Sequence, residues 1–313
     1  MDGMRIKDII SNLKSDGGGL EYAPLMSGLE DVDEMVQGFK PGELCVIASR
    51  PAMGKTAMIL TIARNLAKRD VPVALFTAID TANPLFLSRI VNILSDNEVS
   101  NRPEDVKSVL DNDDMPDLPF YLYANNEMTM DDVRLKAKEM AEVNGVKCIF
   151  IETIQKLFVA GNDKVDAIEM ERVCMDLKSL AVELNIPIII SSDINRGTAA
   201  NDGYEGKRPV LSNLSLCGAI ENVADSVWIL QRPSYYGVIE DIDGSDISNL
   251  AIVIVRKNRL GSIGDVKIGL MKRNALLRNT NQLKKLDNIS AWVCYRAYKC
   301  LSRNNDSGGC ARS

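Results

Sequence analysis

The chain of 313 residues contains no histidine. Catalytic triads that use His and metal sites built from His are therefore excluded, so any chemistry must use carboxylates, Lys, Arg or a bound metal. No apolar run approaches the ~20 residues that a membrane-spanning helix needs. The seven Cys form no C-x-x-C pair, and the first residues, MDGMRIKDIISNLKSDGGG, lack the apolar centre of a signal peptide. We therefore expect a cytoplasmic protein without a membrane segment, a zinc site or a disulfide framework.

The chain also lacks an overall positive charge, although its basic residues are unevenly distributed. The formal net charge is −6, which argues against a general polyanion-binding protein. From Met271 onward, however, nine Lys and Arg residues stand against two Asp residues. We interpret residues 276–313 as a basic C-terminal tail, which is more often a solvated terminus than a nucleic-acid site.

An apolar stripe occurs near the N-terminus. Ile6, Ile9, Ile10 and Leu13 recur at the spacing of one helix face, and the Gly-rich segment SDGGG follows them. Residues 1–19 are thus predicted to form a linker helix and a hinge. A helix this short is marginal alone, so its stripe is expected to dock on its own domain or on a neighbouring subunit.

The segment SRPAMGKT, from Ser49 to Thr56, indicates phosphate binding. In a P-loop, backbone N–H groups cradle the phosphates, the Lys reaches the β- and γ-phosphates, and the Thr hydroxyl binds Mg²⁺. The usual first Gly is replaced by Ser49, so the match is incomplete, and Gly-Lys-Thr alone could be an ordinary turn. The flanks favour the P-loop, because an apolar strand precedes Gly54 and a helix without Gly or Pro follows Lys55.

Apolar runs and helical stretches alternate along the rest of the chain. The expected strands are Leu44–Ala48, Val73–Thr77, Phe120–Tyr123, Cys148–Ile151, Ile186–Ser191, Ser226–Gln231 and Ala251–Val255. The expected helices are Lys55–Lys68, Pro84–Ser95, Pro103–Leu110, Met130–Asn144 and Ala167–Leu184. This order predicts an α/β fold with a mostly parallel twisted sheet and helices on both faces. Ligands then bind at the carboxyl ends of the strands.

Polar residues follow three of these strands. Glu152 is placed to hold the Mg²⁺ that Thr56 binds, although an acid at a strand end can be a simple turn residue. Asp193 and Arg196 follow a second strand, where they suit a sensor of the γ-phosphate or of nucleic acid, or form an ordinary polar loop. Lys257 and Arg259 point the same way from a third strand. They are candidates for neutralising a transferring phosphoryl group, and a solvated edge strand is the alternative.

The chain resembles the RecA-like motor domain of DnaB-type replicative helicases. The resemblance is carried, in the family's order across roughly residues 27–272, by SGLEDVDEMVQGFKPGEL, ASRPAMGKT, IETIQKLF, LKSLAVELNIPIIISSDINR, KRPVLSNLSLCGAIENVADSV, ILQRPSYYG and RKNRLGSIGDVKIG. The family's N-terminal helical domain has no counterpart here. The expected division is a linker at 1–19, a RecA-like P-loop ATPase domain at 20–275 and the tail at 276–313.

The resemblance implies a ring, expected to be hexameric, in which ATP and Mg²⁺ sit between subunits. Lys55, Thr56 and Glu152 then serve one side of each site, and Lys257 and Arg259 reach in from the neighbour. The residues expected to contact nucleotide are Ser49, Arg50, Pro51, Ala52, Met53, Gly54, Lys55, Thr56, Asp193 and Arg232. The residues expected to contact single-stranded DNA are Arg196, Lys207, Arg208 and Gly218.

Several positions depart from the family pattern. The Glu that activates water in the family is replaced by Ile79, and Asp80, the next candidate, would face the other way along a strand. Glu152 replaces the usual Asp of the metal site. Asp193 replaces a neutral Gln, and Ser215 replaces an Arg that contacts DNA phosphates.

Two functions from different classes therefore stand open. The first is an active, ATP-hydrolysing helicase of phage or mobile-element replication, with a helicase loader, a primase or a host replicative helicase as partner. The second is a hydrolysis-impaired relative that binds ATP and acts as a regulator, loader or decoy. A RecA-type strand-exchange protein or a KaiC-like kinase is a weaker third option, because the pair Lys257 and Arg259 favours the helicase branch.

Overall fold

A computed structural model describes residues 23–79, 84–94, 104, 116–157, 167–194, 208–213, 217–241, 243–271 and 276–280. The expected linker helix at 4–14, the loop residue Asp80 and the C-terminal tail beyond residue 280 lie outside these ranges. The expected helix Pro103–Leu110 does too, apart from Glu104.

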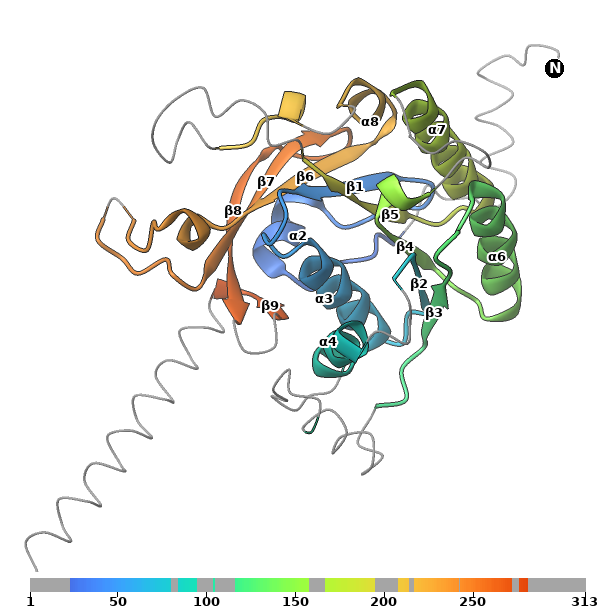
Figure 1. Cartoon of the computed structure of the whole chain (residues 1–313), viewed down its shortest axis with the longest axis horizontal. Coiled ribbons are helices and arrows are strands. Elements are labelled where there is room, and N and C mark those ends of the chain that lie inside the picture. Colours follow the sequence, from blue (N-terminus) through green and yellow to red (C-terminus); the bar gives the residue numbers. More distant parts are fainter. Residues whose placement is uncertain are drawn as a thin grey trace, which may run out of the picture.

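One nine-stranded sheet organises the molecule (Figure 1). The strands lie in the order β3-β2-β4-β5-β1-β6-β7-β8-β9. In chain order they are β1 (Leu44–Ser49), β2 (Val73–Thr77), β3 (Phe120–Ala124), β4 (Cys148–Glu152), β5 (Ile188–Asp193), β6 (Ser226–Gln231), β7 (Leu250–Asn258), β8 (Gly264–Met271) and β9 (Leu276–Arg278). Pairing is parallel from β3 to β6 and antiparallel from β6 to β9.

Helices cover both faces of the sheet, as expected. The longer ones are α3 (Lys55–Ala67), α4 (Pro84–Leu94), α6 (Met130–Val143) and α7 (Ala167–Leu184), joined by the short α2 (Glu30–Val36) and α8 (Cys217–Val223). Short 3-10 helices lie at η1 (Ile154–Lys156), η3 (Leu211–Asn213) and η4 (Pro233–Tyr236). Side chains of α2, α3 and α4 pack into one apolar core, and those of α6, α7 and α8 into another on the opposite face.

The seven strands predicted from apolar runs are present, with ends that differ by one to three residues. The apolar pattern did not predict β8, β9, α2 and α8. β8 carries polar side chains between apolar ones, and α2 has only seven residues. The sheet also extends beyond the expected boundary at residue 275, because β9 pairs with β8 and buries Leu276 and Leu277.

Candidate functional site

The predicted P-loop lies between the carboxyl end of β1 and the first turn of α3. Gly54 is the residue before the helix, and its φ of 104° lies in the region that favours glycine. The first turn of α3 contains no acidic residue. Its unpaired backbone N–H groups and the positive end of the helix dipole therefore form a binding site for anions such as phosphates.

Lys55 begins α3 and contacts a carboxylate. Its Nζ lies 2.5 Å from Oδ1 of Asp193, which ends the neighbouring strand β5. The Lys55 side chain is 11% exposed and that of Asp193 is 48% exposed. Because Ser49 and Asp193 are paired in register, β5 delivers this carboxylate directly beside the P-loop. The structure thus brings together two residues that the sequence predicted at the nucleotide.

Thr56 and Glu152 form the expected metal side of the site. The Thr56 hydroxyl donates a hydrogen bond to Oε1 of Glu152, which ends β4 and is only 5% exposed. Burial raises the pKa of Glu152, and its Oε2 has no hydrogen-bond partner. An orphaned buried carboxylate oxygen beside a hydroxyl fits the oxygen ligands that Mg²⁺ prefers. The described residues contain no cluster of three or more His, Cys, Asp or Glu that could hold a metal, so phosphate oxygens and water would complete the coordination.

The position of the family's water-activating Glu contains an apolar side chain. Ile79 follows β2, is half-buried, and packs against the apolar core that contains α3. Its backbone N–H donates to the Thr77 hydroxyl at 3.0 Å. The structure therefore provides no carboxylate at residue 79.

A rim of arginine and tyrosine adjoins the P-loop. The Arg50 guanidinium donates to the Tyr236 hydroxyl at 2.9 Å, and Arg50, Pro51, Tyr235 and Tyr236 line a cavity of about 330 Å³. Arg232 donates to the carbonyl oxygen of Ala52 at 3.2 Å, so this predicted site residue contacts the P-loop backbone. The tyrosines were absent from the predicted site. The motif ILQRPSYYG contains them, but nothing in its spacing places them against Arg50.

Lys257 and Arg259 lie at the other end of the sheet. Both donate to carbonyl oxygens at the end of α8, Lys257 to that of Glu221 and Arg259 to that of Asn222. They therefore face the same segment, as predicted, and burial together with the charge of Arg259 lowers the pKa of Lys257. The alternative of a solvated edge strand is wrong, because β7 lies between β6 and β8.

The buried carboxylate of Asp225 fixes Arg259. Oδ1 accepts from Arg259 at 3.0 Å, and Oδ2 accepts from Lys178 of α7 at 2.7 Å and from the Leu44 N–H at 2.9 Å. Asp225 was not among the predicted site residues. The sequence offered no signal for it, since Leu44, Lys178 and Arg259 lie far from it along the chain.

The residues predicted to contact DNA are only partly described. Arg196 and Lys207 lie outside the described residues, and the backbone of Gly218 belongs to α8. Arg208 forms an ion pair with Asp265 of β8. The structure therefore does not bring these four residues together at one surface.

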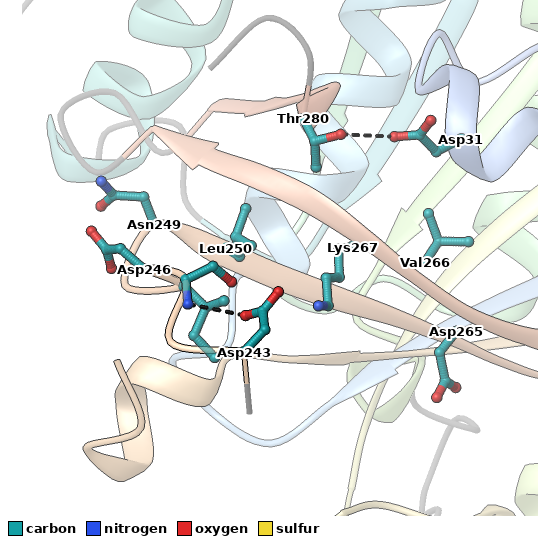
Figure 2. A pocket seen from close by; sticks show the side chains of 11 residues that line it. Asp31, Asp243, Asp246, Asn249, Leu250, Asp265, Val266, Lys267 and Thr280 are labelled. Carbon is teal, nitrogen blue, oxygen red and sulfur yellow. Dashed lines mark hydrogen bonds between the residues drawn. The ribbon is translucent and has the colours of Figure 1, made fainter. Parts of the chain in front are cut away.

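An acidic cavity of about 790 Å³ lies beside β7 and β8, away from the P-loop (Figure 2). Asp31, Asp243, Asp246 and Asp265 line it, with Lys267. Such a lining repels phosphates, so this cavity is not a second nucleotide site. In the part of the chain that is described, no helix is long and apolar enough to cross a membrane.

Known proteins resemble this chain over most of its length. A family model described as the DnaB-like helicase C terminal domain matches residues 24–279. The replicative DNA helicase DnaB of Geobacillus stearothermophilus is 29% identical over 260 residues, which cover 80% of this chain and 56% of that protein. The replicative DNA helicase DnaC of Bacillus subtilis is 29% identical over 273 residues, which cover 85% and 58%. The chain thus spans a little over half the length of these relatives.

Solved structures show the same fold. A DnaB-like replicative helicase, whose interactions with primase were described, superimposes with a TM-score of 0.70 at 23% identity and covers 89% of this chain. A separate helicase ATPase domain also has a TM-score of 0.70, and 99% of that chain is covered. The predicted RecA-like architecture is confirmed.

Proposed function

The chain belongs to the family of DnaB-like helicase C-terminal domains, and from that premise we propose that it is an ATP-driven motor that moves on single-stranded DNA and unwinds duplex DNA. We further propose that it needs Mg²⁺ and works as a homo-oligomeric, hexameric ring in phage or mobile-element replication. A helicase loader, a primase or a host replicative helicase is the proposed partner. The primase described with a solved relative supports testing primase first.

The separation of two cationic groups supports this function most directly. Asn258 pairs with Ser226 and Ser226 with Cys45, so Lys257 and Arg259 lie level with the start of β1. The P-loop follows Ser49, four residues further along β1, which is roughly 13 Å at the rise of a strand. One chain therefore cannot bring both groups to the same phosphates. A ring solves this problem, because Lys257 and Arg259 of one subunit can reach the nucleotide held by the next.

The roles of the side chains follow from their positions. Lys55 and the N-terminal N–H groups of α3 bind the phosphates and neutralise their charge. Thr56 and Glu152 hold the Mg²⁺, which stabilises charge on the phosphoryl oxygens during transfer. Lys257 and Arg259 of the neighbouring subunit stabilise the charge that develops in the transition state. Arg50 and the tyrosines of η4 offer a flat, polar-edged surface to the nucleotide base.

The decisive measurement is the ATPase rate with and without single-stranded DNA. Wild type is expected to hydrolyse ATP faster with DNA, whereas Lys55→Ala and Arg259→Ala are each expected to be inactive. Lys267→Ala is the control, because its partner Asp241 lies in a different region. Mixing the two inactive variants should restore activity, since a Lys55 site can then meet an intact Arg259 from its neighbour. Failure to complement in mixed rings contradicts action between subunits.

A second candidate function is a regulator or decoy that binds ATP and hydrolyses it slowly. The apolar Ile79 at the position of the water-activating Glu favours it, because general-base assistance contributes roughly 10²–10⁴ in rate. A fast wild-type rate with DNA stimulation would exclude this second function.

A further inference from the structure

The ion pair between Lys55 and Asp193 places a negative charge inside the predicted phosphate site. Lys55 Nζ and Asp193 Oδ1 are 2.5 Å apart. The tip of β5 is fixed independently of this pair, because the Asp193 N–H donates to Gln155 Oε1 at 3.3 Å and Gln155 Nε2 donates to the Ser192 hydroxyl at 2.9 Å. The carboxylate therefore does not depend on Lys55 for its position beside the P-loop.

A phosphate-binding Lys serves the β- and γ-phosphates of a nucleotide. In this chain the same ammonium group already has a carboxylate partner, and the Lys side chain is almost buried. Incoming phosphates must replace that carboxylate at Lys55. Once they have done so, they stand next to a like charge that β5 continues to hold in place, and like charges at this range repel.

We propose that Asp193 is a specificity-determining residue of the nucleotide site. It occupies Lys55 in the absence of nucleotide, and it lowers affinity most for the nucleotide with the most negative charge near Lys55. It therefore reduces the preference for ATP over ADP. This inference rests on the proposed function, because it requires the P-loop to bind nucleotide.

The exposure of Asp193 limits the size of the effect. Its side chain is 48% exposed, so water and salt screen its charge, and exposed ion pairs contribute little. Lys55 is 11% exposed and is screened less. We expect Asp193→Asn to tighten binding of a non-hydrolysable ATP analogue by ~3- to 30-fold, and binding of ADP by less. The gain should shrink as salt is added.

The test is calorimetric titration of the full chain with Mg²⁺ and either the ATP analogue or ADP. Asp193→Asn removes the charge and keeps the backbone contact with Gln155. Asp241→Asn is the matched control, because it neutralises a Lys-paired carboxylate remote from the P-loop. Equal thermal melting of wild type and both variants shows that the fold is unchanged.

The expected result is a higher ratio of ATP-analogue affinity to ADP affinity in Asp193→Asn alone. Unchanged or weaker binding of the analogue by Asp193→Asn overturns the inference, as does an equal gain for both nucleotides. Lys55→Ala separates the two levels of the argument. If wild type binds and Lys55→Ala does not, the nucleotide site stands whatever Asp193 does. If Lys55→Ala binds as well as wild type, the proposed function fails.

Discussion

Replacing Asp225 tests whether one buried carboxylate holds Arg259 in place. The Asp225 side chain is 8% exposed and accepts hydrogen bonds from the Leu44 N–H, from Lys178 and from Arg259. It thereby connects the start of β1 with α7 and β7. We expect Asp225→Asn to destabilise the fold far more than Arg259→Ala does.

The magnitudes follow from the exposure of each partner. Lys178 and Arg259 are 28% and 49% exposed, so each stays hydrated when its ion pair is lost, and each pair contributes about 0.5–1 kcal/mol. The bond from the Leu44 N–H to a charged acceptor contributes about 1.5–3 kcal/mol, of which a neutral amide oxygen keeps roughly 1 kcal/mol. Asp225→Asn should therefore cost about 2–3 kcal/mol in the free energy of unfolding. Arg259→Ala should cost less than about 1 kcal/mol.

Urea unfolding of the two variants and of wild type measures these values. Asp225→Ala, which also leaves the buried Leu44 N–H without a partner, should cost about 1–3 kcal/mol more than Asp225→Asn. The reasoning is refuted if Arg259→Ala costs as much as Asp225→Asn, because Arg259 would then be a structural residue. It is also refuted if Asp225→Asn is as stable as wild type.

The remaining predictions concern the carboxylate of the metal site and the position of the missing carboxylate. Burial raises the pKa of Glu152 above its ordinary 4.5, so between these values the folded chain binds more protons than the unfolded chain. In metal-free buffer the free energy of unfolding of wild type should therefore fall, relative to Glu152→Gln, as pH rises from 4.5 through the raised pKa; urea titrations that show the opposite slope would contradict this. Glu152→Gln should also weaken Mg²⁺-dependent nucleotide binding. Ile79→Glu should raise the ATPase rate by up to ~10²-fold if the site is otherwise complete, whereas Asp80→Ala should abolish activity if Asp80 serves instead. Steady-state ATPase rates decide between them, and no change in either variant would mean that neither position provides the base.

Much of the sheet could be predicted because buried parallel strands are written as continuous apolar runs. β1, β2 and β4 are buried at every position, and their runs were visible without any structure. β8 and β9 could not be predicted in this way. β8 alternates polar and apolar side chains, and β9 has only three residues, which are stabilised by pairing with β8 and by packing against α3.

The nucleotide side of the site was also readable in the sequence. Lys55 and Thr56 form a local motif, and Glu152 and Asp193 are polar residues that end apolar strands. Parallel strands bring such ends to one edge of a sheet, so these four residues had to lie near one another. The contact of Asp193 with Lys55 was not predictable, because it depends on the register between β1 and β5.

The sequence by itself determined the local elements and the P-loop, because helix and strand patterns and the turn at Gly54 depend on neighbouring residues. Only the tertiary structure decided which distant side chains meet. Asp225 reaches Leu44 across 181 residues, and Arg50 reaches Tyr236 across 186. Such contacts arise from strand order and register, which place residues level with one another whatever their separation along the chain. For the same reason, only the fold shows that Arg259 lies at the opposite end of the sheet from Lys55.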